Sequence, residues 1–223
     1  MAVVTVSRQC GSGGREIARA VADILGATYV DRHLISEAAR RIGVAENLVA
    51  VRDERVEGIT EKLIDAVALA FTGPRSTSES RQPGVAGGLT DVETVAATRR
   101  VVREVATAGN AVLLGRGSQM ILRDNPRALH VHIIAPLPQR IQTIARREGI
   151  PAEGARRLIA RVEEERANYL RTHYQVDWAN PQIYHVVLNT GLLTHALAAH
   201  AIVLLATALD GSQPLAQTKG YAG

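Results

Sequence analysis

The first 25 residues constrain the fold of this chain more than any other stretch. Residues 2–6 are rich in β-branched residues, residues 7–14 are rich in glycine, and from Ile17 to Leu25 apolar residues recur at helical spacing. This order predicts a strand, a tight loop and a helix, with the loop amides and the helix N-terminus around one small volume. Such a volume attracts anions, because unpaired N–H groups and the helix dipole both favour negative charge.

The loop departs from the phosphate-loop signature G-x-x-x-x-G-K-[ST]. When Gly13 takes the place of the second glycine, Arg8 stands at the first glycine, Gly14 at the lysine and Arg15 at the hydroxyl residue. The lysines of the chain are far from this loop in the sequence. If phosphate binds here, Arg8, Arg15 and backbone amides must supply the positive charge. The alternative is a tight turn in which the glycines serve geometry alone.

Arginine dominates the charge of the chain, which has a net charge of +4 and a pI near 9.6. Guanidinium groups suit oxyanions, so phosphate recognition is one explanation. A genomic composition rich in Ala, Gly and Arg is the other. Aromatic residues make up only 3% of the chain, which argues against a stacking platform for single-stranded nucleic acid. The basic residues fall in separate loops and not in a continuous stripe, so nucleic acid is not an expected partner.

The single cysteine, Cys10, excludes an intramolecular disulfide, which is compatible with a reducing cytoplasm. We interpret Cys10 as a small neutral filler in preference to a reactive thiol. The longest apolar run, residues 192–209, is interrupted by threonines and histidines, so it predicts a buried or half-buried helix and not a membrane span. No basic segment with an apolar signal core opens the sequence. We therefore expect a cytoplasmic protein without a membrane partner.

Strands and helices alternate along the chain. Strands are predicted at residues 2–6, 27–30, 111–114, 129–134 and 184–188. Helices are predicted at residues 15–25, 34–42, 45–70, 90–108, 138–147, 151–172 and 192–209. Because each strand is apolar along its length, the pattern indicates an α/β fold with a parallel sheet covered on both faces.

In such sheets the ligand site lies beyond the carboxyl ends of the strands. That rule selects residues 7–14 after the first strand, Asp31 and Arg32 after the second, residues 115–117 around Arg116 after the third, and residues 189–190 after the last. Three of these four loops carry arginine. Arginines scattered at random over the surface would not be expected to gather in these loops. The sequence therefore predicts an anion site at one rim of the sheet.

Two segments lack the apolar residues of a core. Residues 72–89 are rich in Gly, Pro, Ser and Arg and cannot order themselves by burial, so a mobile loop is predicted. Residues 210–223 are small and polar and predict a disordered tail. The remainder, residues 1–209, is long enough for a single domain with one sizeable core.

With these motifs in view, the chain resembles the cytidylate kinase-like family, a branch of the nucleoside monophosphate kinases. The resemblance covers nearly the whole chain and is carried by SRQCGSGGREIA, YVDR, GNAVLLGRG and ERANYLRTHYQVDWANPQIYHVVLNT. It implies a three-layer P-loop kinase-like fold with a five-stranded parallel sheet. It further implies an acceptor-binding helical insertion at residues 34–90, a mobile lid at residues 137–172, and ATP and Mg²⁺ as cofactors.

The resemblance also implies roles for individual residues. Contacts to the donor nucleotide fall to Gly11, Ser12, Gly13, Gly14, Arg15, Glu16 and Arg146. Contacts to the acceptor fall to Asp31, Arg32, Arg116, Arg161, Glu164, Arg166 and Asp177. The groups expected to act on the transferred phosphoryl are Arg8, Arg15 and Arg116.

The chain departs from the kinase pattern at several positions. Gly117 replaces an aspartate that follows the arginine in the kinases, and His185 replaces another aspartate in the last strand. Arg15 and Glu16 stand where a magnesium-binding hydroxyl is expected, so no metal ligand is assigned to the protein.

Structural alternatives exist for some candidates. The charged face of residues 153–171 is compatible with a solvated helix held by i,i+3 and i,i+4 pairs, each worth about 0.2–0.5 kcal/mol. His130 and His132 alternate on a strand, which favours core-flanking or paired histidines over a metal site. Asp177 and Trp178 are equally compatible with an anchored loop.

Phosphoryl transfer needs in-line placement and positive charge on the equatorial oxygens, both of which arginines and amides can provide. We therefore hypothesise ATP-dependent phosphorylation of a nucleoside monophosphate, CMP or dCMP first. The alternatives are a nucleotide-binding regulatory protein with little or no turnover, favoured by the absent lysine, and a kinase for another small acceptor. Nucleotides are the expected partners, and the sequence is also compatible with a homo-oligomer.

Overall fold

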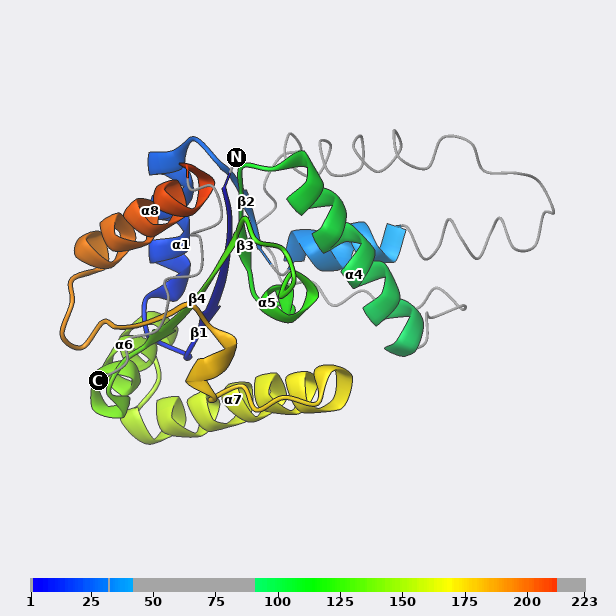
Figure 1. Cartoon of the computed structure of the whole chain (residues 1–223). Helices are drawn as coiled ribbons and strands as arrows, with labels where there is room; N and C mark the ends of the chain where they lie inside the picture. The colour runs from blue at the N-terminus through cyan, green and yellow to red at the C-terminus, as the bar shows by residue number, and fades with distance from the viewer. Residues whose placement is uncertain (1, 32, 42–90, 212–223) are drawn as a thin grey trace, which may run out of the picture.

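The computed structural model describes residues 2–31, 33–41 and 91–211. Its five strands are β1 (Val3–Arg8), β2 (Thr28–Val30), β3 (Ala111–Leu114), β4 (Ala128–Ile134) and β5 (Val186–Asn189). All neighbouring pairs are parallel, in the order β2-β3-β1-β4-β5 (Figure 1). The predicted five-stranded parallel sheet is thus confirmed.

The helices follow the predicted alternation and cover both faces of the sheet. They are α1 (Gly14–Leu25), residues 33–41, α4 (Asp91–Ala108), α5 (Ser118–Ile121), α6 (Leu137–Glu148), α7 (Ala152–Tyr174) and α8 (His195–Gly211), with a short 3₁₀ turn at Pro181–Ile183. The prediction ended the last helix two residues too early. Arg32, the predicted helix at 45–70, the loop at 72–89, most of the 34–90 insertion and residues 212–223 lie outside the described residues.

Alternate side chains of the strands feed two separate cores, which is why apolar residues occupy both faces of the strands. Val4 and Val6 of β1 pack with α1 and α8, whereas Val3 packs with α4 and the helix at 33–41 (Figure 1). Helix α8 buries Ala198 and Ile202 against the first of these cores, which confirms the half-buried helix predicted there. Within the described ranges, none of the helices combines the length and apolarity needed to cross a membrane.

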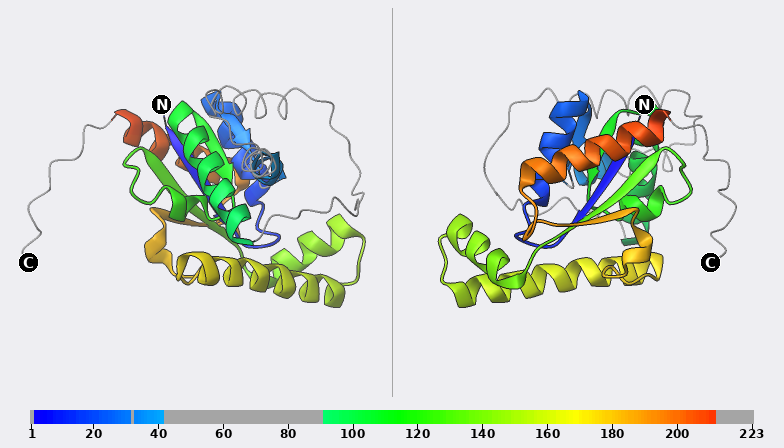
Figure 2. Two further views of the ribbon diagram at one scale, coloured as in Figure 1. Left: turned by 90° about the vertical axis from the view of Figure 1, so that its right-hand side faces the viewer. Right: turned by 60° about the vertical axis from the view of Figure 1, so that its left-hand side comes forward.

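Helices α6 and α7 form a hairpin that runs across the carboxyl ends of the strands (Figures 1 and 2). A third, smaller core joins the two helices through Ile141, Ile144 and Ile159, and Cys10 of the glycine loop belongs to it. Burial raises the pKa of the Cys10 thiol, which agrees with a neutral filler. The predicted lid is therefore docked on the glycine loop in this structure, and its mobility remains a prediction.

The two histidines of β4 are core residues. Nδ1 of His130 lies 2.8 Å from Oγ1 of Thr5, and the His130 ring stacks on His185 with centroids 4.8 Å apart. The His132 ring stacks on Tyr184 at 4.6 Å. Within the described residues no group of three His, Cys, Asp or Glu side chains can hold a metal ion. Both histidines of β4 are thus core residues, as predicted, and each stacks on a different ring of the segment before β5.

These histidines make stability depend on pH. Burial lowers the pKa of both His130 and His132 from 6.5 to about 4. Between pH 6.5 and 4 the unfolded histidines bind protons that the folded ones do not, so the free energy of unfolding should fall as the pH falls through this window. At about 1.4 kcal/mol per pKa unit the combined loss is several kcal/mol.

Urea unfolding at pH 7, 6, 5 and 4 measures this loss. His132→Phe, which keeps an aromatic ring against Tyr184, should remove about half of the histidine contribution to the pH slope. Equal slopes for the variant and the parent would contradict the assignment.

Candidate functional site

The glycine loop is anchored to the end of β4 by its own polar groups. The backbone N–H of Gln9 donates to the carbonyl of Ile133 (2.9 Å), and the Gln9 side-chain oxygen accepts from the N–H of Ala135 (3.0 Å). Oγ of Ser12 lies 3.0 Å from the Gln9 carbonyl and 3.2 Å from the Ile133 carbonyl, and Ser12 is buried. The Ser12 hydroxyl therefore faces inward, so what the loop presents outward is backbone.

Helix α1 begins immediately after this loop. Gly13 is its N-cap, with a φ of 76°, so the loop enters the helix through a left-handed residue that favours glycine. The amides of Gly14, Arg15 and Glu16 are the first of the helix and have no intrahelical acceptor. This is the arrangement that binds anions at helix N-termini.

The Arg8 side chain crosses from the glycine loop to the loop after β3. A Cβ built on Gly14 would lie 2.5 Å from Cβ of Arg8, and a Cβ built on Gly115 would lie 2.6 Å from Nη1 of Arg8. Because both neighbours are glycines, the guanidinium lies against backbone at the rim of the sheet.

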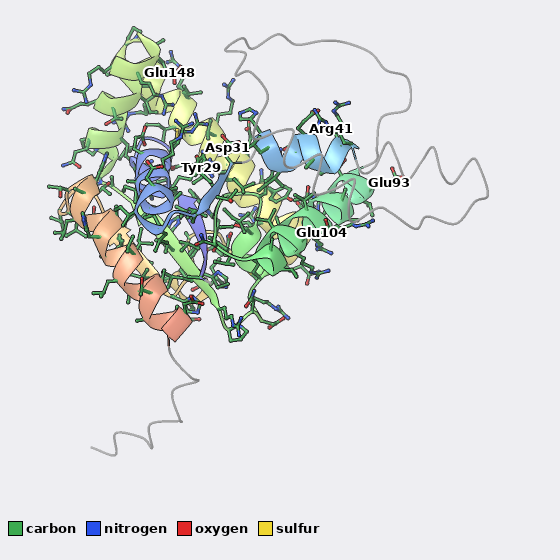
Figure 3. The ribbon with its side chains drawn as sticks, turned by 90° about the horizontal axis from the view of Figure 1, so that it is seen from above. Tyr29, Asp31, Arg41, Glu93, Glu104 and Glu148 are labelled. Carbon is green, nitrogen blue, oxygen red and sulfur yellow. The ribbon has the colours of Figure 1, made fainter. Side chains whose placement is uncertain are left out.

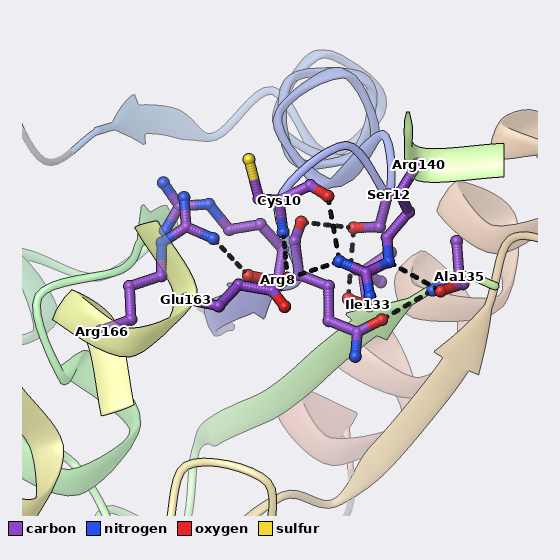
Figure 4. A network of polar contacts seen from close by, with 9 residues as sticks. Arg8, Cys10, Ser12, Ile133, Ala135, Arg140, Glu163 and Arg166 are labelled. Atoms are coloured by element: carbon purple, nitrogen blue, oxygen red, sulfur yellow. Dashed lines mark hydrogen bonds and ion pairs between the residues drawn. The ribbon is translucent and has the colours of Figure 1, made fainter. Parts of the chain in front are cut away.

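Three arginines from distant parts of the chain line one cavity of about 200 Å³ at this rim. They are Arg8 from β1, Arg116 from the loop after β3, and Arg166 from α7. Nη1 of Arg166 also donates to the backbone carbonyl of Arg8 (2.7 Å). Figure 4 shows the side chains of Arg8 and Arg166 on the same side of the polar network. Glu165, Gln119, Tyr169 and Trp178 are among the other lining residues.

Arg116 is held in an uncommon backbone conformation. It has a φ of 58° between Gly115 at 81° and Gly117 at 66°. A left-handed conformation costs a residue with a side chain about 1–2 kcal/mol, and such strain clusters at functional sites. A guanidinium N–H of Arg116 donates to Oγ of Ser36, on the helix at 33–41. The side chain thus extends between the cavity and that helix.

The structure explains why an aspartate is absent at position 117. A Cβ on Gly117 would lie 2.8 Å from Cε2 of Tyr174, at the end of α7. Helix α7 therefore packs closer to this loop than a side chain at position 117 would allow. His185, which replaces the other aspartate of the kinase pattern, has a structural role here. Its Nδ1 accepts a hydrogen bond from the backbone N–H of His130 (2.8 Å).

A pair of substitutions tests this packing. Gly117→Ala and Gly149→Ala impose the same left-handed penalty, at φ values of 66° and 65°, but a Cβ at Gly149 would meet nothing within 4 Å. We expect Gly117→Ala to lower the free energy of unfolding by about 1–2 kcal/mol more than Gly149→Ala, as for an overpacked site. Urea unfolding measures both, and equal losses would show that Tyr174 moves aside without cost.

The remaining candidates near α1 lie apart from this cavity. Arg15 is exposed in the first turn of α1, and its charge acts on Tyr29. Tyr29 and Asp31 are labelled close together in Figure 3. Oδ1 of Asp31 accepts from the N–H groups of His33 (2.9 Å) and Leu34 (3.2 Å), so Asp31 caps the helix at 33–41. Glu16 is exposed as well. The structure thus brings Arg8 and Arg116 together, joins Arg166 to them, and leaves Arg15 outside the cavity lining.

The candidates on the hairpin divide in the same way. Glu165 and Arg166 line the cavity, whereas Arg161, Glu164 and Arg146 are exposed and do not line it. Asp177 is exposed, and its Oδ1 accepts from the N–H of Ala179 (2.9 Å), as an anchored loop requires. The neighbouring Trp178 is buried and donates from Nε1 to Oγ of Ser7 (2.9 Å), beneath the cavity.

A buried ion pair that sequence reasoning missed ties the hairpin to the glycine loop. Nη1 of Arg140 on α6 lies 2.6 Å from Oε1 of Glu163 on α7, and that oxygen also accepts from the N–H of Cys10 (2.8 Å). Nε of Arg140 donates to the carbonyl of Ala135 (2.9 Å) (Figure 4). In the sequence both residues resemble the exposed charges around them, so no local pattern identifies the pair.

His195 is a second residue that the sequence analysis missed. A Cβ on Gly13 would lie 2.2 Å from Nε2 of His195, so this exposed imidazole lies directly against the glycine loop. Oγ1 of Thr190 donates to the carbonyl of Ser12 (2.9 Å) and holds the loop after β5 in place. The rule that ligand sites lie beyond the carboxyl ends of the strands selected residues 189–190. A segment five residues longer would have included His195.

The glycine loop offers no hydroxyl ligand to magnesium at the usual position, so the ion would be held through the phosphates of a bound triphosphate. The position of the phosphate-loop hydroxyl is taken by the exposed Arg15, and the Ser12 hydroxyl faces inward. Mg²⁺ commonly keeps several waters and binds mainly through substrate phosphates, which requires few protein ligands.

A model of the cytidylate kinase-like family matches residues 3–192 of the chain. A cytidylate kinase of Ignicoccus hospitalis is 28% identical over 195 residues, covering 86% of this chain and 92% of that protein. A uronate isomerase of Corynebacterium glutamicum is 30% identical over 109 residues, which are 48% of this chain but only 20% of that protein. A solved structure of an uncharacterized protein from Eubacterium ventriosum has a TM-score of 0.67 at 16% identity and covers 95% of this chain and 100% of that one, a likeness of fold alone.

Proposed function

The chain belongs to the cytidylate kinase-like family, and we propose that it transfers the γ-phosphoryl group of ATP to a nucleoside monophosphate, CMP or dCMP first. Family and fold support a kinase-like phosphotransferase. The observation that carries the finer proposal is the meeting of Arg8, Arg116 and Arg166 in one cavity, with the stem of Arg8 against Gly14 at the start of α1.

Each part of the site has a task in this reaction. The free amides at the start of α1 bind donor phosphate oxygens, as helix N-termini do. Arg116 and Arg166 bind the acceptor phosphate as bidentate guanidinium groups. An acceptor oxygen then attacks the γ-phosphorus in line, the bond to the β-phosphate oxygen breaks, and ADP leaves. Magnesium carried by the donor neutralises phosphate charge.

The α6–α7 hairpin contributes by its position. Because α7 runs over the carboxyl ends of the strands and supplies Arg166 and Tyr169 to the cavity, it keeps water away from the transferred group. Docking of the hairpin on Cys10 holds these side chains at the rim. Small nucleotides are the proposed partners.

One observation favours a second candidate function, a nucleotide-binding regulatory protein with little turnover. The glycine loop has neither the usual lysine nor an outward-facing hydroxyl. ADP release with MgATP and each of CMP, dCMP, UMP and AMP, together with calorimetric binding of MgATP, separates the two. Turnover above the acceptor-free background supports the kinase, whereas tight MgATP binding with no acceptor-dependent ADP would establish the regulatory protein.

A further inference from the structure

We infer that Arg8 and Gly14 are an exchanged pair: the cation that a phosphate loop carries at its lysine position is supplied in this chain from the position of its first glycine. The inference rests on the proposed function for its chemistry, whereas its steric part rests only on the contact between positions 8 and 14. It assigns to Arg8 the contact with the phosphoryl group as that group passes between donor and acceptor.

The helix start sets the alignment of this loop with the motif. Gly13 is the N-cap of α1 and Gly14 its first residue, so Gly14 occupies the place of the lysine at the start of the helix. Arg8 then lies six residues earlier, at the end of β1, where the motif has its first glycine.

The side chains of positions 8 and 14 exclude one another. A Cβ on Gly14 would lie 2.5 Å from Cβ and 2.9 Å from Cγ of Arg8. The nearest atom is attached to the backbone, so a rotamer change of Arg8 does not relieve the contact. A chain with a side chain at position 8 therefore needs glycine at position 14, and a lysine at position 14 needs glycine at position 8.

Backbone geometry gives no other reason for glycine at position 14. Gly11 and Gly13 have positive φ values, but Gly14 does not and begins a regular helix. A helical glycine of this kind is less stable than alanine. The space taken by Arg8 is what accounts for Gly14.

The exchange also redirects the charge. From its stem beside Gly14, the Arg8 side chain extends to Gly115, whose Cβ position is 2.6 Å from Nη1, and into the cavity of Arg116 and Arg166. The stem of Arg8 thus lies beside the first residue of α1, and its guanidinium reaches the proposed acceptor site. Its planar fork can bind two phosphate oxygens at once, which an ammonium group at position 14 does not do in the same way.

A double-mutant cycle tests the steric part by thermal unfolding. Gly14→Ala should lower the midpoint by about 3 °C or more in the parent and raise it in the Arg8→Gly background, where the helix gains from alanine. Arg8→Ala should not produce this reversal, because it keeps the clashing Cβ. Gly154→Ala is the matched control: its Cβ would meet Ile150 at no less than 3.7 Å, so it should be stabilising. If Gly14→Ala stabilises the parent, the exchange is overturned.

Calorimetric binding of MgATP tests the chemical part. Arg8→Gly should weaken binding at least tenfold, and Arg8→Gly/Gly14→Lys should recover most of that loss. Unchanged binding in Arg8→Gly would overturn the inference, as would a double variant no better than Arg8→Gly although it unfolds cooperatively. Absence of turnover with every acceptor would remove the proposed kinase function, while both of these binding comparisons would still decide the exchange.

Discussion

Arg116→Ala is expected to lower kcat/KM for the nucleotide acceptor by about 10²–10³-fold, the usual effect of removing one preorganised donor to a developing phosphate charge. Arg116 lines the cavity and is held there by a left-handed backbone and by Ser36. The amides of α1 are unaffected by the substitution, so MgATP affinity should stay within about twofold.

Steady-state kinetics with varied acceptor at saturating MgATP measure the effect. Arg157→Ala, which removes an exposed arginine of α7 outside the cavity, is the matched control and should leave kcat/KM unchanged. Arg116→Lys should recover only part of the rate, because an ammonium cannot replace the bidentate fork. Equal losses for Arg116→Ala and Arg157→Ala would remove Arg116 from the site.

Arg140→Met is expected to destabilise the fold by about 3–5 kcal/mol, the cost of leaving one member of a buried ion pair without its partner. The side chains of Arg140 and Glu163 are only 7% and 19% exposed. After the substitution the Glu163 carboxylate keeps the N–H of Cys10 but loses its counter-charge. Replacing both residues by methionine should recover most of the loss, since buried pairs are often matched by apolar side chains.

Urea unfolding at pH 7 compares these variants. Arg147→Met is the control on the same helix, where an exposed pair with Glu148 should contribute less than about 1 kcal/mol. A loss for Arg140→Met as small as that for Arg147→Met would show that the pair is open to water and does not hold the hairpin.

The strands and the glycine loop were predictable because their signals are local. Runs such as residues 111–114 are apolar throughout and short, and a parallel strand buried on both faces requires that pattern. The predicted last strand began two residues too early, at Tyr184. Tyr184 and His185 precede the strand, and their rings stack on His132 and His130 of β4. Secondary structure that depends on a side chain's partner is not visible in a local pattern.

The site was predictable in part. Arg8 and Arg116 follow from the rule that parallel strands end at one edge. The same rule applied to the second strand selected Asp31, which caps a helix and is not in the cavity lining. Among the charges of α7, helical spacing could not tell Arg166 from Arg161, because which of them faces the sheet depends on how the helix lies across the rim.

By itself, the sequence determined the α/β alternation, the glycine loop at the start of α1 and the end of the sheet at which charges gather, because each is encoded by neighbouring residues. Only the tertiary structure decided which charges meet. It also decided which other residues come into contact. Separations of a few ångströms between elements define three such pairs, namely Arg140 with Glu163, Arg8 with Gly14, and Gly117 with Tyr174. Such distances arise from the packing of helices on the sheet, and no local periodicity specifies them.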